Sequence, residues 1–507
     1  MWKLCLKLDR CMPFKLRRVL AVIFGVSEML FFGGIMYGMN ALFPVLQKEL
    51  IFANLCPDST NPTGCPEQVA MYANAFTTYS VVMMIFLAIV GILIDYIGLR
   101  LVKLASTLLY FIGMLMFAFV TPSTSPIIFV GGTFASVGGM GMFMCMFTVN
   151  QLFTTTSVIV LAFVTGSYDA SSSLFAIVQL TYNAGISLQT TFLILAFCGL
   201  IMGVFSACFI LSYWLPDMAA YKNASNASIV VEEDFENIDL PSKNPTEELE
   251  EDEEEETIVE VEELSADAKA DAILTEIFPN RRKSLSSLPF IVAVIYFSLA
   301  LLRFTFFLAE LTPAADAHFN DTDTTARIGS TLSFALAGGI LAGLACGSVI
   351  DKLRAVFRPK IRDLLSLEPS SDRDNALVWL KLRPMGYSMY IMASCALIVS
   401  CLVFVPMEEV YYVNFFFLVV MRGFLFSTFS SSILAAFPIA QFGTLYGIGG
   451  AIAGAFSCLQ YAFLIPPPLI GNGCALALAV LLFIPPTIIF IRSAIFLSRL
   501  HNSSQTK

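Results

Sequence analysis

Runs of about 20 apolar residues recur along the chain and alternate with short polar segments. A run of this length crosses the hydrocarbon core of a bilayer as a helix, because lipid offers the backbone no other hydrogen-bond partner. We therefore predict an all-α integral membrane protein with twelve transmembrane helices. The predicted spans are 19–42, 72–94, 101–120, 127–148, 157–179, 190–213, 288–311, 328–350, 387–405, 411–435, 444–465 and 474–496.

Composition supports this interpretation. Of the 507 residues, 57% are hydrophobic and 13% are charged, whereas soluble proteins average about 25% charged residues. The net charge of −10 is concentrated at 231–264, where 17 acidic residues accompany one lysine, so the remainder is slightly basic. This pattern excludes an ordinary soluble enzyme and, without clustered basic residues in a folded domain, a nucleic-acid binder.

Six spans on each side of a long hydrophilic segment predict two pseudo-symmetric six-helix bundles. The predicted parts are a cytoplasmic N-terminal segment (1–18), the N-terminal bundle (19–213), a cytoplasmic linker (214–287), the C-terminal bundle (288–496) and a cytoplasmic tail (497–507). We expect the linker to be disordered, because nine acidic residues in ten at 247–256 cannot bury apolar surface.

Lysine and arginine predict the orientation, since they concentrate in short cytoplasmic loops. These residues occur in the N-terminal segment, in the loop with Arg100 and Lys103, and in the region 352–383. Both termini are therefore expected in the cytoplasm, and the plasma membrane is the default location. On the opposite side, Cys56 and Cys65 share a loop and are predicted to form a disulfide, with two free thiols as the alternative. Asn320 begins a glycosylation sequon on that side.

One motif occurs in both halves. Gly91 and Asp95 are followed by Arg100, and Gly347 and Asp351 are followed by Arg354. Glycine and aspartate four residues apart share a helix face, so the glycine permits close approach of a neighbouring helix while the carboxylate meets an arginine or the positive end of a helix. We predict that these six residues gate the cytoplasmic side, although a single such loop is also a common topogenic turn.

This motif pair in a twelve-span chain resembles the major facilitator superfamily and, more narrowly, solute carrier family 43. The narrower resemblance rests on segments 27–32, 166–173, 182–185, 422–424, 437–438 and 442–447 and on Arg303. It implies facilitative, sodium-independent carriage of small organic solutes, which are large neutral amino acids for some members and purine nucleobases for one branch. Gly166-Ser-Tyr resembles the amino-acid carriers, whereas Asp169 with the serines at 171–173 resembles the nucleobase branch.

Ionisable groups inside spans mark the candidate solute site, because a central charge costs about 2.5–3.5 kcal/mol even on mild insertion scales and needs a partner or a watery cavity. Solute binds such carriers near the midplane between the halves, and the resemblance implies that spans one, four, seven and ten line the cavity. The candidate solute-binding residues are Glu28, Tyr37, Ser167, Tyr168, Arg303 and Arg422. A buried charge network that only fixes helix packing is the alternative, and Asp169 is expected to order its serine-rich surroundings.

We therefore expect alternating-access uptake of large neutral amino acids, with purine nucleobase transport as the alternative. Proton coupling through Glu28 or Glu310 stays open, because a buried carboxylate is the usual proton carrier. A non-transporting nutrient sensor or accessory membrane protein is the alternative from another class. Phosphate-binding glycine loops, Cys-x-x-Cys pairs and metal-spaced histidines are missing from the sequence, so no enzyme activity, cofactor or metal is expected. Ser284 follows three basic residues and is a candidate phosphorylation site. The alternative is that these basic residues only form a cluster at the membrane edge.

Overall fold

The computed structural model describes residues 14–56, 66–147, 149, 157–211, 269–319, 324, 328, 331–332, 334–405 and 407–505. Among these residues the secondary structure is helical, without strands, and twelve segments are long and apolar enough to span a membrane. The predicted all-α class and the twelve spans are confirmed. Cys65, Asn320 and most of the predicted linker lie outside the described residues.

The N-terminal half contains α2 (Phe14–Glu28), the π-helix Met29–Gly33, the 3₁₀ helix Ile35–Leu42, α3 (Phe43–Lys48), α4 (Pro66–Ile97), α5 (Leu99–Ala118), α6 (Ile127–Met146), α7 (Ser157–Ala170), α8 (Leu174–Asn183) and α9 (Leu188–Phe205), which continues into the π-helix Ser206–Ile210. The C-terminal half contains α12 (Arg281–Leu285), α13 (Leu288–Phe319), α15 (Gly339–Leu365), α16 (Ser371–Leu402), α17 (Glu408–Ala436), α18 (Phe442–Ser457), α19 (Gln460–Leu464), α20 (Pro468–Leu481) and α21 (Ile484–Gln505).

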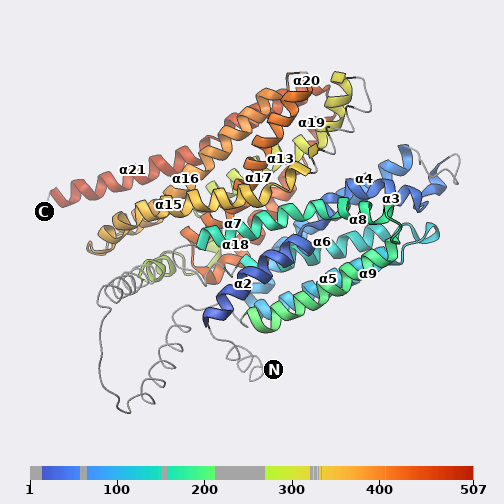
Figure 1. Cartoon of the computed structure of the whole chain (residues 1–507). Helices are drawn as coiled ribbons and strands as arrows, with labels where there is room; N and C mark the ends of the chain where they lie inside the picture. Colours follow the sequence, from blue (N-terminus) through green and yellow to red (C-terminus); the bar gives the residue numbers. More distant parts are fainter. Residues whose placement is uncertain are drawn as a thin grey trace, which may run out of the picture.

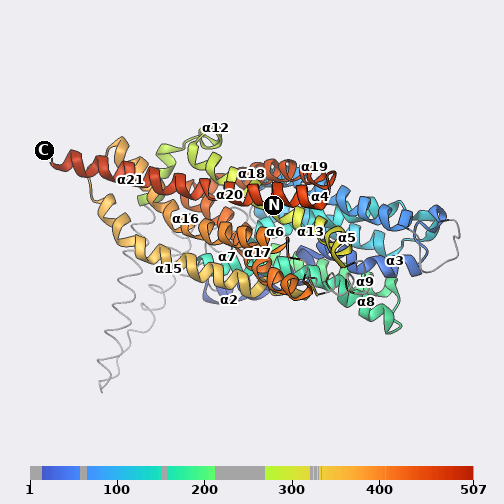
Figure 2. The same cartoon turned by 90° about the horizontal axis from the view of Figure 1, so that it is seen from above.

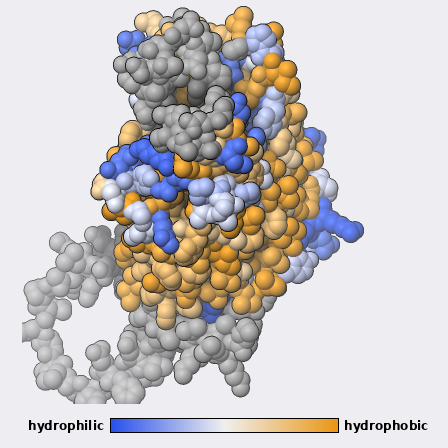
Figure 3. Space-filling model, turned by 90° about the vertical axis from the view of Figure 1, so that its right-hand side faces the viewer, coloured by the Kyte–Doolittle hydropathy of each residue, from blue (hydrophilic) through white to orange (hydrophobic). Residues whose placement is uncertain are grey.

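The two halves form two groups of roughly parallel helices that lie side by side (Figure 1; Figure 2). Their contact consists mainly of two helix pairs, α4 with α18 and α7 with α15. We call the end of the bundles where α2 begins and α21 ends the terminal end. Large hydrophobic side chains such as Leu341, Phe416 and Ile201 remain exposed, and hydrophobic residues dominate much of the visible surface in Figure 3. Such a surface suits contact with lipid rather than water.

The first span is interrupted where it meets the fifth. A π-helical turn ends at Gly33, and Gly34 donates its backbone N–H to Ser171 Oγ at 2.8 Å. A β-carbon on Gly34 would lie 2.5 Å from the Tyr168 carbonyl oxygen, and one on Gly38 would lie 1.9 Å from that of Ser172. Only glycine permits this approach, and irregular turns of this kind occur often at functional sites.

The predicted loop between spans two and three is almost absent. Gly98, at a φ of 86°, is the single residue between α4 and α5, and this left-handed conformation favours glycine. Because α5 begins at Leu99, Arg100 and Lys103 are helical and buried, with 3% and 0% exposure. Both are predicted in the loop but lie in α5, where Arg100 donates to the Ala207 carbonyl and Lys103 pairs with Glu28.

The described end of the linker is ordered, unlike the disorder expected throughout 214–287. Residues 269–277 are helical and α12 follows them. Gln441 donates its Nε2 to the Phe278 carbonyl oxygen at 2.7 Å and accepts the Ser284 hydroxyl at 2.6 Å through Oε1. Ser284 is fully buried in this contact, so a kinase reaches it only after α12 detaches. Its phosphorylation stays a prediction.

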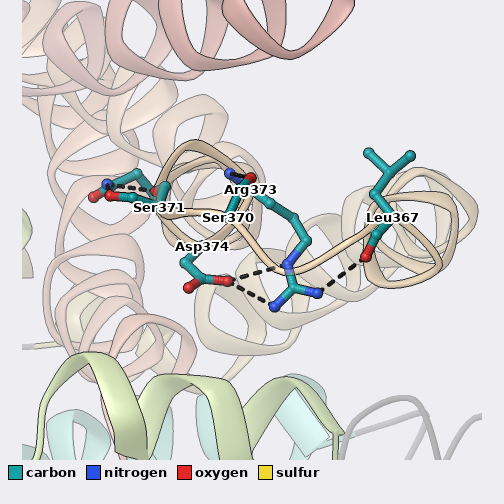
Figure 4. A network of polar contacts seen from close by, with 6 residues as sticks. Leu367, Ser370, Ser371, Arg373 and Asp374 are labelled. Carbon is teal, nitrogen blue, oxygen red and sulfur yellow. Dashed lines mark hydrogen bonds and ion pairs between the residues drawn. The ribbon is translucent and has the colours of Figure 1, made fainter. Parts of the chain in front are cut away.

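The basic region between spans eight and nine is also helical. α15 extends to Leu365, and α16 begins after Ser370, whose hydroxyl accepts the Arg373 backbone N–H at 3.2 Å. The Arg373 guanidinium donates to Asp374 at 2.8 and 3.1 Å and to the Leu367 carbonyl at 3.1 Å (Figure 4). This cap satisfies backbone groups that the turn would otherwise leave without partners. The last predicted span comprises two helices, since Pro485 and Pro486 lack the N–H groups that a continuous helix needs.

Candidate functional site

A buried ion pair joins the two halves. Arg422 of α17 donates its Nε to Asp169 Oδ1 of α7 at 2.8 Å, and its Nη2 lies 2.6 Å from the same oxygen. The two side chains are 6% and 4% exposed. Aromatic rings surround the guanidinium carbon, with the centroids of Phe304 and Phe426 at 4.6 Å and that of Tyr37 at 5.5 Å.

The pairing has a simple electrostatic cause. Arginine keeps its charge in proteins, and an unpaired charge at membrane depth is costly. Removing one member of a buried pair costs about 3–5 kcal/mol, because the other charge is left without compensation. Asp169 therefore balances Arg422 across the boundary between the halves. The sequence predicts that Asp169 orders its serine-rich surroundings, and it does not predict this pairing with Arg422.

Other polar and aromatic groups lie around this pair. The Tyr168 ring stacks on Phe143 with centroids 4.1 Å apart and meets Tyr37 edge-on at 6.1 Å. Thr165 Oγ1 and Ser427 Oγ, from opposite halves, are 2.7 Å apart. Ser167 donates instead to the Phe163 carbonyl of its own helix at 2.8 Å. Of the six predicted solute-binding residues, Tyr37, Tyr168 and Arg422 thus gather in one place.

Glu28 lies in a different cluster, inside the N-terminal half. Its Oε1 is 2.5 Å from Lys103 Nζ, and Ser206 donates its hydroxyl to Oε2 at 2.9 Å. Glu28 and Lys103 are completely buried. This network links spans one, three and six, which fits the alternative that some intramembrane charges fix helix packing.

Arg303 also points into its own half. Its Nε donates to Ser400 Oγ of α16 at 2.7 Å, and its guanidinium carbon is 5.8 Å from the Phe307 centroid. The neighbouring Phe304 turns toward Arg422 instead. Arg303 lies on a predicted cavity helix, span seven, but its side chain faces span nine.

The repeated aspartates form two related contacts at the terminal end. Asp95 Oδ2 of α4 accepts the backbone N–H of Thr444 at 2.9 Å and the Thr444 hydroxyl at 2.5 Å, in the first turn of α18. Asp351 Oδ2 of α15 accepts the backbone N–H of Ile159 at 2.9 Å, in the first turn of α7. Each aspartate therefore caps a helix of the opposite half, where a negative charge is favoured by the helix dipole.

Basic partners differ between the two contacts. Arg281, just before the second bundle, has its Nε 3.7 Å from Asp95 Oδ2 and its guanidinium carbon 4.7 Å from the Tyr96 centroid. Arg354 Nη1 lies 3.8 Å from Asp351 Oδ1. Arg100, a predicted partner of Asp95, donates to the Ala207 and Leu211 carbonyls at 2.9 Å, at the end of span six.

Glycines make these interfaces possible. A β-carbon on Gly91 would lie 2.0 Å from the Gly443 carbonyl oxygen, and one on Gly447 would lie 2.6 Å from that of Leu87. In the other interface, a β-carbon on Gly343 would lie 2.4 Å from the Ala162 carbonyl oxygen. Gly347 is buried in the same helix, α15. The helix pairs that meet at the terminal end are thus in backbone contact.

The family follows from comparison of the whole chain. The Major Facilitator Superfamily model matches residues 26–460. The chain belongs to the major facilitator superfamily. Equilibrative nucleobase transporter 1 of Bos taurus is 24% identical to this chain and covers 95% of it and 96% of its own length. Large neutral amino acids transporter small subunit 3 of Homo sapiens is 23% identical, with 90% and 89% covered.

Both relatives are members of solute carrier family 43, which confirms the narrower resemblance. The family and its members are transporters rather than enzymes. Among solved structures, a bacterial homologue of the iron transporter ferroportin in its outward-facing state is 11% identical with a TM-score of 0.51, covering 94% of this chain and 99% of its own. That likeness concerns the fold alone. The chain is a multi-pass membrane transporter of the major facilitator superfamily.

Proposed function

We propose that this transporter carries large neutral amino acids by facilitated alternating access, and that the solute binds between the halves at Arg422 and Asp169. The observation that carries the proposal is the buried ion pair that joins α17 to α7. A zwitterionic amino acid has the same two charges as this pair. Its carboxylate replaces Asp169 beside Arg422, and its ammonium replaces Arg422 beside Asp169.

This exchange keeps the site electrically balanced. Both protein charges keep an opposite partner while the pair separates. The complex of protein and solute therefore avoids the several kcal/mol that an uncompensated buried charge costs. A neutral nucleobase offers hydrogen bonds but no charges, so it leaves more of that cost uncompensated. The aromatic rings of Tyr37, Phe304 and Phe426 supply the apolar contacts that a large neutral side chain needs.

Purine nucleobase transport is the second candidate. The stacked rings of Tyr168 and Phe143, 4.1 Å apart, favour it because a planar base binds well among aromatic faces. The names of the relatives cover both solute classes at nearly equal identity. The charges at the site, rather than those names, lead us to favour amino acids.

The transport cycle follows from the two helix caps. With Asp95 on the first turn of α18 and Asp351 on the first turn of α7, the terminal end is closed. Basic residues concentrate at this end, so we assign it to the cytoplasm, and we assign the chain to the plasma membrane. Solute then enters from the outside, separates Arg422 from Asp169, and allows the halves to rock so that both caps open. This cycle needs no ion gradient.

Uptake by the purified protein in vesicles tests the proposal, with radiolabelled leucine, phenylalanine, adenine and guanine each supplied. We expect saturable uptake of the two amino acids. Arg422→Ala should reduce it about 10- to 150-fold, because hydrogen bonds to a charged group contribute about 1.5–3 kcal/mol. Arg499→Ala, at an arginine 60% exposed on α21, is the matched control and should transport normally.

Other outcomes have clear meanings. Saturable uptake of adenine or guanine without amino-acid uptake would establish the second candidate. Solute binding without uptake would indicate a sensor. Amino-acid uptake that is equal in wild type and Arg422→Ala would show that the site lies elsewhere.

A further inference from the structure

Arg303 is a buried cation whose charge the transport site does not use. Its side chain belongs to a residue only 1% exposed, and its Nε is bonded to Ser400 Oγ. Its two terminal nitrogens, Nη1 and Nη2, have no hydrogen-bond partner among the described residues. A guanidinium has five N–H donors, so four of those on Arg303 are without an acceptor within the described structure.

The groups that contact Arg303 come from two helices, α13 and α16. Phe307 lies on the same helix, α13, and its ring meets Phe415 of α17 edge-on at 6.5 Å. Ser400 of α16 uses its own hydrogen to donate to the Ala396 carbonyl at 2.7 Å. The side chains that contact Arg303 within the described structure are therefore neutral.

The nearest carboxylate of the same helix is too far along it to neutralise Arg303. Glu310 follows seven residues later, which separates the two positions by about 10 Å along the axis. Its Oε1 is also without a partner among the described groups. In the N-terminal half, by contrast, spans one and three are joined by a complete ion pair, Glu28 with Lys103. Spans seven and nine, their counterparts, are joined by a cation and a hydroxyl.

We propose that Arg303 holds a small inorganic anion, chloride under ordinary conditions, inside the C-terminal half. The anion accepts from Nη1 and Nη2. This occupant removes the cost of a buried, uncompensated guanidinium, which cannot shed its proton. The site is separate from the solute site, because Phe304, next to Arg303, faces Arg422 and Arg303 faces α16. Chloride is thus a structural ligand of the second bundle rather than a transported solute.

Thermal unfolding of the purified full-length protein tests this proposal. The unfolding midpoint is measured in sodium chloride and in sodium gluconate at equal ionic strength, over a range of chloride fractions. Because a ligand stabilises the state that binds it, we expect a saturable rise on the order of 2 °C with chloride. Bromide, of similar size, should act like chloride. Equal midpoints in chloride and gluconate for the wild-type protein would overturn the proposal.

Two variants identify the residue. Arg303→Met keeps the length of the side chain without its charge, and it should abolish the chloride response. Arg499→Met, at the exposed arginine of α21, is the matched control and should retain the full response. A chloride response unchanged in Arg303→Met would also overturn the assignment. The wild-type salt comparison decides the proposal even should Arg303→Met fail to fold, and neither result depends on the identity of the transported solute.

Discussion

The substitution Asp95→Asn tests the terminal-end gate. Asp95 Oδ2 accepts two hydrogen bonds from Thr444, at 2.9 and 2.5 Å, in the first turn of α18. Hydrogen bonds to a charged group contribute about 1.5–3 kcal/mol and neutral ones about 0.5–1.5 kcal/mol. The favourable interaction of an anion with a helix N-terminus adds about 0.3–1 kcal/mol. Losing the charge should therefore destabilise the closed terminal end by about 2 kcal/mol, which is about a 30-fold change in the opening equilibrium.

Cysteine alkylation measures this opening. Leu87 of α4 is 1% exposed and packs where a β-carbon on Gly450 of α18 would lie, 2.2 Å from Leu87 Cδ2. A Leu87→Cys protein should react slowly with a bulky maleimide. The reaction of the native cysteines is measured in the protein without this substitution and subtracted. As long as the open state is a small fraction of the population, adding Asp95→Asn should raise the alkylation rate of the cysteine at position 87 about 30-fold.

The second half supplies both a parallel and a control. Asp351→Asn should have a similar effect, because Asp351 caps α7 as Asp95 caps α18. Asp363→Asn, at an exposed position of the same helix α15, should leave the rate unchanged. A rate in Asp95→Asn within twofold of the wild-type rate would refute the idea that these caps hold the terminal end closed.

Two further substitutions test packing within and between the halves. Glu28→Gln should lower the free energy of unfolding by about 3–5 kcal/mol by leaving Lys103 unpaired, and a second change, Lys103→Met, should restore much of the loss in thermal unfolding. Gly447→Val should abolish uptake that requires closure of the terminal end, because the added β-carbon would lie 2.6 Å from the Leu87 carbonyl oxygen. Gly473→Val should retain uptake, because a β-carbon there would meet nothing within 4 Å. Equal unfolding in wild type and Glu28→Gln, or equal uptake by both valine variants, would contradict these expectations.

The spans and the gating aspartates were predictable from sequence because their signals are local. Twenty apolar residues suffice to indicate a membrane helix, and Gly-x-x-x-Asp in both halves indicated two equivalent contacts. The motif predicts the positive end of a helix or an arginine as the partner of each aspartate, and both Asp95 and Asp351 accept from helix amides. For Arg100 the structure shows other partners: α5 begins at Leu99, two residues before the predicted span, and Arg100 donates to carbonyls at the end of span six.

The solute site was less predictable, because it depends on how each helix is rotated. Glu28, Arg303 and Arg422 all lie on predicted cavity helices, yet Glu28 and Arg303 face neighbours within their own halves. Asp169 and Arg422 are 253 positions apart, and no spacing rule joins them. Charge counting could have suggested the pair, since Asp169 is an acidic group in span five and needs a cation at the same depth.

Solute analogues test the central claim most directly. Inhibition of leucine uptake is compared for leucine, for leucinol, which lacks the carboxylate, and for 4-methylpentanoate, which lacks the ammonium, in wild type, Arg422→Ala and Asp169→Asn. In the wild-type protein each lost charge should weaken inhibition at least about tenfold, a coupling of about 1.4 kcal/mol. Arg422→Ala should no longer distinguish leucine from leucinol, and Asp169→Asn should no longer distinguish leucine from 4-methylpentanoate. The quantity compared is the inhibition by leucine relative to that by each analogue. If this ratio is the same in all three proteins, the solute does not exchange partners with this ion pair.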